Sequence, residues 1–203
     1  MQMNWGLSIQ KYETNLGLEY PVPEVKYMDW KGMELSRLHG NKDFESYNEY
    51  IEFVINHPVI FISYFKHAFN GLDITTPRAY IFKDLYHRSI LLKLFNYTLL
   101  FLGILGVYFT FRKSSRLVKV FTILIFTISG LILPLAIEVR FFLPLHFILY
   151  FYGLSFLNDF ILEKKVFQRK WWLVITLVYI CFVSFCLYRS ESLMSTLEFY
   201  NKI

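Results

Sequence analysis

The chain has 203 residues, of which 55% are hydrophobic and 20% aromatic, and its mean hydropathy is +0.38. This composition favours an integral membrane protein. The pI of 9.1 does not indicate nucleic-acid binding. Residues 1–88 carry nine Lys and Arg against eleven Asp and Glu, so the basic excess lies among the apolar stretches of residues 89–203 and not on a solvated module.

Residues 1–45 are predicted to be irregular and extended. Several glycines interrupt any periodicity, and Tyr20-Pro21-Val22-Pro23 holds the backbone in extended conformations. The segment still carries aromatic side chains such as Trp5, Tyr27 and Trp30, which give it apolar surface to bury. We therefore expect it to pack on a membrane body.

Helical periodicity begins at Glu45, since apolar residues recur at three- and four-residue spacing at Tyr47, Tyr50, Ile51 and Val54. A second helix is predicted over Pro58–Phe69, with Pro58 in its first turn and Gly71 as a left-handed cap. It is too short to cross a bilayer. Its aromatic residues favour an amphipathic helix in the membrane interface, and a helix of a small soluble outer domain is the alternative.

Four apolar stretches follow, of 17 to 23 residues each, which is close to the ~20 that a spanning helix needs. They are Ser89–Phe111, Leu117–Ile137, Phe141–Leu157 and Trp171–Tyr188. They lack the alternation of barrel strands. We predict an all-α membrane protein with about four transmembrane helices in residues 89–203, preceded by a partly irregular outer segment, residues 1–88, with interfacial amphipathic helices.

Basic residues indicate the orientation. The first loop between the predicted spans carries Arg112, Lys113, Arg116 and Lys119, and the third carries Lys164, Lys165, Arg169 and Lys170. Short loops rich in Lys and Arg stay cytoplasmic, so residues 1–88 are expected to be extracytoplasmic. Contact with anionic lipids is a second role for these loops. An outward segment of this length without a leader pattern is either exported as a long N-terminal tail or, in the interpretation that we favour, preceded by further spans of a longer protein.

The corner between the second and third spans is the sharpest local feature. Glu138 and Arg140 place opposite charges at the edge of the hydrocarbon, where ionisable groups are costly and tend to pair. An outward guanidinium suits the phosphate of a lipid-linked substrate. Alternatively, the two side chains only pair with each other and anchor the hairpin at the interface.

Two motifs carry a resemblance to a known family. The E-x-R-F-F-x-P stretch from Glu138 to Pro144 resembles the R-(Y/F)-x-x-P element late in the membrane region of GT-C glycosyltransferases. These include protein O-mannosyltransferases and lipid A aminoarabinose transferases. The HP-x8-H-x2-NGLD stretch from His57 to Asp73 is similar to the outer juxtamembrane region of large bacterial members.

The resemblance implies transfer of a sugar from a polyprenyl-phosphate donor at the outer face of a bacterial inner membrane. Arg140 would bind the lipid phosphate, whereas Glu138 has no securely matched role. The family's catalytic carboxylate follows its first membrane helix, and here no predicted span precedes Asp29 or Asp43. The resemblance therefore implies a C-terminal part of such an enzyme, inactive without a preceding region or another membrane subunit. Its catalytic residues stay unassigned.

Further polar residues of the outer segment could bind an anionic or sugar ligand, namely His57, His67, Asn70, Asp73, Arg78, His87 and Arg88. Interfacial anchoring is the alternative role for each of these residues, and it is the role expected of Lys93 and Asn96. His146 is expected to form a hydrogen bond between helices. No metal-binding pattern is present, Cys181 and Cys186 are interpreted as small apolar residues, and no cofactor is expected.

Two other functional classes stay open. One is a small non-catalytic membrane subunit that assists the assembly of envelope polysaccharide. The other is a transporter fragment, which the near absence of charge in the predicted mid-membrane regions makes less favourable. The expected partners are the lipid bilayer and a polyprenyl-phosphate-linked sugar, with no nucleic acid.

Overall fold

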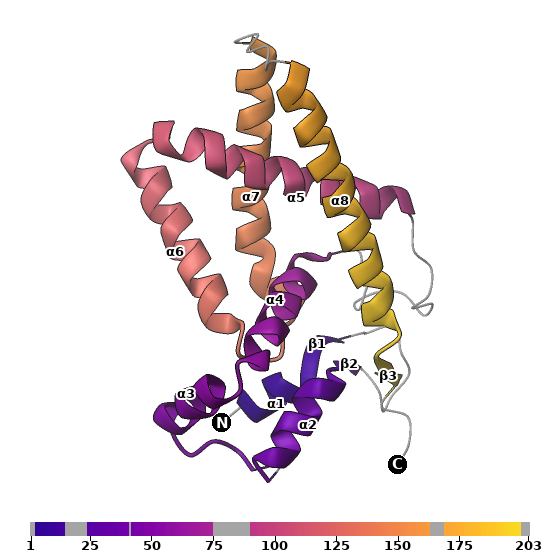
Figure 1. Ribbon diagram of the computed structural model, residues 1–203. Coiled ribbons are helices and arrows are strands. Elements are labelled where there is room, and N and C mark those ends of the chain that lie inside the picture. Colours follow the sequence, from indigo (N-terminus) through magenta and orange to yellow (C-terminus); the bar gives the residue numbers. More distant parts are fainter. Residues whose placement is uncertain (1–2, 15–23, 41, 75–89, 163–168, 200–203) are drawn as a thin grey trace.

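A computed structural model describes residues 3–14, 24–40, 42–74, 90–162 and 169–199 of the chain. These residues are mostly helical, with one small sheet at the end of the molecule where both described chain ends lie (Figure 1). The N-terminal module consists of α1 (Met3–Ser8), β1 (Ile9–Thr14), β2 (Glu24–Met28), α2 (Trp30–Leu38), α3 (Tyr47–Asn56) and α4 (Val59–Leu72).

The prediction that residues 1–45 are irregular is wrong. β1 and β2 pair antiparallel, and α2 begins directly after Asp29, whose side chain accepts a hydrogen bond from the backbone N–H of Gly32. A carboxylate in this position satisfies one of the unpaired N–H groups at a helix start. The pairing of two strands across the intervening segment is a tertiary event, and neither strand carries a local pattern strong enough to indicate it.

The sheet has the order β1-β2-β3, because β3 (Leu197–Phe199) pairs antiparallel with β2. One bond outside the ladder strengthens this join, because the backbone N–H of Met28 donates to the carbonyl of Thr196. The backbone N–H of Asp29 donates to the carbonyl of Ser8 at the end of α1. The C-terminal end of the chain is therefore part of the same unit as its N-terminal module.

The two predicted helices of this module are present. Ser46 caps α3, and Pro58 immediately precedes the first residue of α4. The role predicted for Gly71 is wrong, since α4 continues through it to Leu72. A Cβ on Gly71 would come within 2.5 Å of the Phe142 ring, so the missing side chain allows a helix contact and does not serve a left-handed cap.

Four longer helices form the rest of the structure: α5 (Ile90–Thr110), α6 (Arg116–Ile132), α7 (Val139–Leu162) and α8 (Arg169–Met194), with a short 3₁₀ turn, η1 (Phe111–Lys113), after α5. By length and composition, three of the described segments could cross a membrane. They are Ile90–Lys113, Val139–Asp159 and Trp172–Met194. The predicted second span is shorter than expected, because α6 has 17 residues and ends before the turn at Leu133 and Pro134.

Helix α5 crosses α7 in Figure 1, whereas α7 and α8 run in nearly opposite directions along the length of the molecule. Glycine permits the close approach at the crossing. A Cβ on Gly106 would lie 2.1 Å from the carbonyl oxygen of Tyr152, and one on Gly103 would lie 2.6 Å from that of Leu149. Small residues let helix backbones approach in this way in membrane proteins, where dispersion contacts hold helices together.

The charges of the long helices are separated along the molecule. The turn from η1 to α6, with exposed Arg112, Lys113 and Arg116, lies at the end of α6 away from the N-terminal module (Figure 1). The connection from α6 to α7 lies at the other end, against that module. We call this connection, residues 133–138, the α6–α7 corner.

Substitution of Gly106 by Ala tests the crossing. We expect a loss of about 1–3 kcal/mol in stability, because the added methyl group overpacks a backbone contact that cannot easily yield. The midpoint of thermal unfolding in detergent measures it. Gly130→Ala is the matched control, since a Cβ there meets nothing within 4 Å. Equal midpoints for the two variants would contradict the proposed contact.

Candidate functional site

The α6–α7 corner is held by two elements of the N-terminal module. The backbone N–H of Tyr12 in β1 donates to the carbonyl of Ile137 at 2.8 Å. The Nδ1 atom of His67 in α4 lies 2.7 Å from the carbonyl oxygen of Leu133. Leu135 packs against a core cluster that includes Leu7 and Ile60. Because both carbonyls bond outside the corner, the turn is positioned by tertiary contacts at its two ends.

Glu138 and Arg140 lie where the corner enters α7. The Nε atom of Arg140 is 2.7 Å from a carboxylate oxygen of Glu138, whose side chain is 1% exposed, whereas the Arg140 side chain is 53% exposed. The guanidinium also lies over the Phe141 ring. Burial raises the pKa of Tyr12, and a hydrogen bond to Glu138 raises it further. At the corner, the accessible side chain of Arg140 thus pairs with the buried carboxylate of Glu138.

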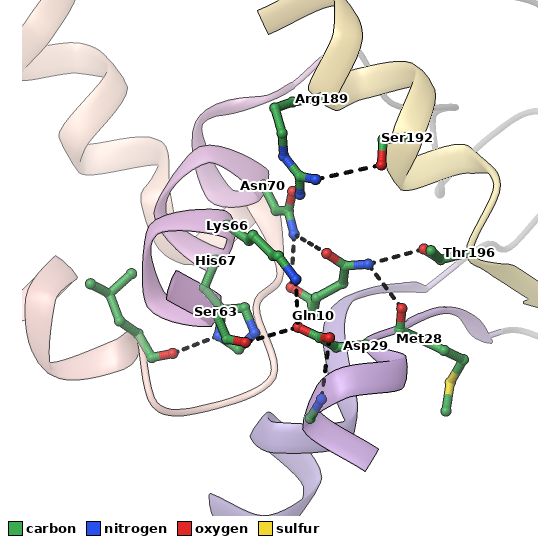
Figure 2. A network of polar contacts seen from close by, with 12 residues as sticks. Gln10, Met28, Asp29, Ser63, Lys66, His67, Asn70, Arg189, Ser192 and Thr196 are labelled. Carbon is green, nitrogen blue, oxygen red and sulfur yellow. Dashed lines mark hydrogen bonds and ion pairs between the residues drawn. The ribbon is translucent and has the colours of Figure 1, made fainter. Parts of the chain in front are cut away.

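A second group of polar side chains lies between the N-terminal module and the end of α8. We call it the polar cluster, and it consists of Gln10, Asp29, Ser63, Lys66, His67, Asn70 and Arg189 (Figure 2). Asp29 is buried at its centre. One carboxylate oxygen of Asp29 caps α2, and the other accepts from the hydroxyl of Ser63 at 3.0 Å and pairs with the ammonium of Lys66 at 3.4 Å.

The other half of the polar cluster joins α4 to the sheet. The Nδ2 atom of Asn70 donates to the carbonyl and to the side-chain oxygen of Gln10, each at 3.3 Å. Gln10 in turn donates to the carbonyl of Met28 at 2.9 Å and to the hydroxyl of Thr196 at 3.0 Å. One amide side chain therefore connects β1, β2 and the segment that follows α8.

Arg189 approaches the polar cluster from α8, next to Asn70 in Figure 2. Its Nη1 atom lies 3.5 Å from the hydroxyl of Ser192. Its Nη2 atom is buried and makes no hydrogen bond within the part of the chain that the structure describes. The negative charge of Asp29 is close enough to act on this guanidinium. The two cations, Lys66 and Arg189, thus share the field of one buried carboxylate.

His67 is 1% exposed, and its Nε2 atom has no hydrogen-bond partner among the described residues. Burial lowers the pKa of His67 below its ordinary value of 6.5, which outweighs the opposing effects of the Leu133 carbonyl and Asp29. The ammonium of Lys66 adds to the lowering. The imidazole is therefore neutral near pH 7, with Nδ1–H donating to the corner.

The C-terminal end of α4 is buried among the long helices, where its carbonyls need donors. The carbonyl of Leu72 accepts from the Nδ2 atom of Asn96 in α5 at 3.4 Å and from His146 in α7 at 3.0 Å. The carbonyl of Asp73 accepts from the buried ammonium of Lys11 at 3.1 Å. The predicted hydrogen bond of His146 between helices is thereby confirmed.

Lys93 and Asn96 do not act as the interface anchors that were expected. Both are buried. Lys93 pairs with Glu191 of α8 at 2.6 Å, and the side-chain oxygen of Asn96 accepts from the hydroxyl of Tyr150 at 2.7 Å. Both side chains bond within the protein because α5, which carries them, is covered here by α7 and α8.

Only part of the predicted set of site residues comes together. His67 and Asn70 belong to the polar cluster, and Asp73 lies buried at the end of α4. His57 is separate, with its ring on Phe53 and its Nδ1 atom 2.9 Å from the Phe53 carbonyl oxygen. Arg78, together with His87 and Arg88, lies outside the described residues.

The sequence analysis missed the other members of the polar cluster, namely Gln10, Asp29, Ser63, Lys66 and Arg189. One signal was present. Ser63, His67 and Asn70 recur at four- and three-residue spacing, with Lys66 beside them, and so form a polar stripe on an otherwise aromatic helix. A polar stripe on such a helix indicates a face that meets buried polar partners. The partners in β1 and α8 could not be found by periodicity.

An apolar cavity of about 310 Å³ lies among α4 to α8. Its walls are formed by Phe69, Leu72, Leu100, Ile104, Val107, Phe126, Leu145, Leu149, Phe182 and Cys186. Cys186 faces it as a small apolar side chain, in line with the interpretation from the sequence. Phe69 and Leu72 close it on the side of the polar cluster, so it is separated from the cluster by one turn of α4.

Comparisons with protein-family models, with curated proteins and with solved structures find no match. Functional interpretation therefore depends on the chemistry of the two polar regions. The exposed guanidinium at the corner is suited to binding an anionic group. In the polar cluster the acceptors of Asp29 are already engaged by α2, Ser63 and Lys66, which suits a structural join better than proton transfer.

His67 predicts a pH dependence of stability. Its pKa is lowered in the folded protein, so the unfolded chain binds more protons at acidic pH. The stabilisation is present above pH 6.5 and is lost as the pH falls toward the folded-state pKa. We expect the midpoint of thermal unfolding to fall between pH 7 and pH 5, and His67→Gln to reduce this fall. An identical fall in both proteins would exclude His67 as the titrating group.

Proposed function

We propose that the chain is the C-terminal part of a polyprenyl-phosphate-sugar-dependent membrane glycosyltransferase of the GT-C kind, acting in the synthesis of cell-envelope glycan. In this proposal Arg140 positions the phosphate of the lipid-linked donor. Glu138 holds the Nε side of the guanidinium and keeps the side chain at the corner. The sugar and the acceptor are recognised elsewhere in the complete assembly.

The observation that carries the proposal is that the Arg140 side chain is accessible while its partner, the carboxylate of Glu138, is buried. The carboxylate is covered, whereas the Arg140 side chain is 53% exposed and can be reached by a ligand. The ion pair through Nε keeps the guanidinium beside Glu138. A planar, permanently charged donor group is suited to phosphate oxygens.

The orientation that the proposal requires follows from the separated charges. With the exposed basic turn of Arg112, Lys113 and Arg116 in the cytoplasm, the α6–α7 corner and the N-terminal module are extracytoplasmic. We propose a bacterial inner or plasma membrane as the location. Arg140 would then meet a donor lipid at the outer face, where polyprenyl-linked sugars are used.

The catalytic carboxylate is proposed to lie outside this chain. Asp29 is buried and engaged by three donors, and Glu138 is paired with Arg140. The same engagement favours the second candidate function, a non-catalytic membrane subunit that assists polysaccharide assembly. The two functions differ in one respect: only the first requires Arg140 for transfer of sugar from the lipid donor.

Replacement of Arg140 tests the proposed phosphate contact. Hydrogen bonds to charged groups contribute about 1.5–3 kcal/mol, so Arg140→Ala should lower the rate of glycan transfer by about 10- to 100-fold in the longest natural form of the protein. Arg140→Lys should restore only part of it, because an ammonium lacks the planar fork. Transfer is measured with membranes and a labelled lipid-linked sugar.

The control for this experiment is Arg112→Ala, an exposed arginine in η1, which precedes the other end of α6. It should leave transfer unchanged while removing the same charge and a similar apolar stem. Normal transfer by Arg140→Ala would remove the support for a donor-lipid role. If Arg140→Ala also leaves the amount of assembled polysaccharide unchanged, the result would favour the accessory function.

The orientation can be tested separately with single cysteines in a background where exposed Cys181 is replaced by Ala. Lys42→Cys, in the N-terminal module, should react with a membrane-impermeant maleimide in intact cells. Lys113→Cys should react only after the cells are permeabilised. Both positions are exposed, so access to the reagent decides the result. The reverse pattern would contradict the orientation.

A further inference from the structure

An apolar surface runs over α3 and α4 on the side away from the polar cluster. We call it the α3–α4 face, and it is made by the exposed side chains of Tyr47, Ile51, Ile55, Val59, Phe61, Ile62 and Phe65. Phe65 is 80% exposed and Ile55 is 68% exposed. Monomeric soluble proteins rarely expose large apolar side chains so densely, and such surfaces mark a contact with another phase or partner.

The spacing of these residues makes each helix amphipathic around its own axis. On α3, Tyr47, Ile51 and Ile55 recur every four residues, and Tyr50 and Val54 face the core. The polar residues Asn48, Glu49 and Glu52 take the remaining side. On α4, Phe61 and Phe65 lie opposite the stripe of Ser63, His67 and Asn70. The apolar face is therefore distinct from both the core face and the solvated face.

The contacts of α4 join this surface to the long helices. The last turns of α4 enter the bundle, where Phe69 contacts the rings of Tyr97 in α5 and Phe185 in α8. Its first turns extend out of the bundle toward α3 (Figure 1). A helix held in this way carries Phe65 close to the bundle and Val59 farther from it.

The position of α3 is set by the α6–α7 corner. Tyr50 and Val54 share a core cluster with Leu135 of that corner, and α3 lies beyond the end of α6 in Figure 1. On either side of the corner, the long helices expose apolar side chains themselves, Leu131 at the end of α6 and Leu143 near the start of α7. The helices that carry the α3–α4 face thus pack on the corner between two long helices that expose apolar side chains of their own.

We infer that the α3–α4 face is immersed in the lipid leaflet on the side of the N-terminal module, with the acyl chains of membrane lipids as its occupant. The packing of α4 against α5 and α8, which are long and apolar enough to cross a bilayer, favours lipid over a soluble partner. The acidic polar side of α3 offers no attraction to anionic headgroups. Immersion therefore depends on the apolar side chains. This surface is separate from Arg140 and does not rest on the proposed function.

Nitroxide labels on single cysteines test the inference in the full chain, with Cys181 replaced by Ala and the protein placed in nanodiscs of phosphatidylcholine and phosphatidylglycerol. Labels at Ile51→Cys and Phe65→Cys should collide readily with oxygen and several-fold less with a water-soluble nickel complex than a label at Glu52→Cys. The label at Phe65→Cys should lie deepest in the bilayer. Glu52 is the matched control, since it is exposed on the adjacent side of the same helix.

Two results would overturn the inference. Nickel accessibility at Ile51→Cys equal to that at Glu52→Cys would place the face in water. Low accessibility to both reagents would indicate a protein cover, and loss of spin–spin broadening on dilution with unlabelled protein would identify a second copy. The unmodified chain offers a further measurement: a photoreactive acyl-chain lipid should label peptides spanning residues 47–65. Labelling confined to α5–α8 would contradict the inference.

Discussion

Burial of the C-terminal end of α4 is the constraint on which much of the structure depends. A helix end among apolar helices leaves carbonyl groups that water cannot reach, and each must find a donor. Asn96 of α5 and His146 of α7 supply donors to Leu72, and Lys11 of β1 supplies one to Asp73. Three elements far apart in the chain are thereby joined at one point. A cation near a helix C-terminus is also favourable to the helix dipole.

The fixed end of α4 determines the positions of the two polar regions. With its end fixed, α4 directs Ser63, His67 and Asn70 toward Asp29, Gln10 and the α6–α7 corner. The corner in turn holds Glu138 in a buried position, and Arg140 emerges beside it. The polar cluster is an internal join between the N-terminal module and α8. The accessible chemistry is at the corner, which is why the proposed function rests on Arg140.

The long helices show how small residues determine packing. Gly103 and Gly106 of α5 meet the backbone of α7 near Gly153, and Gly71 of α4 meets the ring of Phe142. Each glycine was visible in the sequence, but a glycine can equally end a helix or permit a close approach. The interpretation of Gly71 as a cap failed for this reason. Which role a glycine plays depends on whether another element lies against it.

Hydropathy and helical periodicity by themselves determined the membrane character and the existence of α3, α4 and the long helices, and the neighbouring opposite charges of Glu138 and Arg140 indicated a pair as one of two interpretations. These properties are local, because a helix of about 20 apolar residues or a pair of adjacent opposite charges needs no distant partner. Only the tertiary structure decided the sheet that joins the two ends of the chain, the end of α6 before Pro134, and the polar cluster. Asp29, Gln10 and Arg189 carry no shared spacing, and it is folding that brings them together across most of the length of the chain.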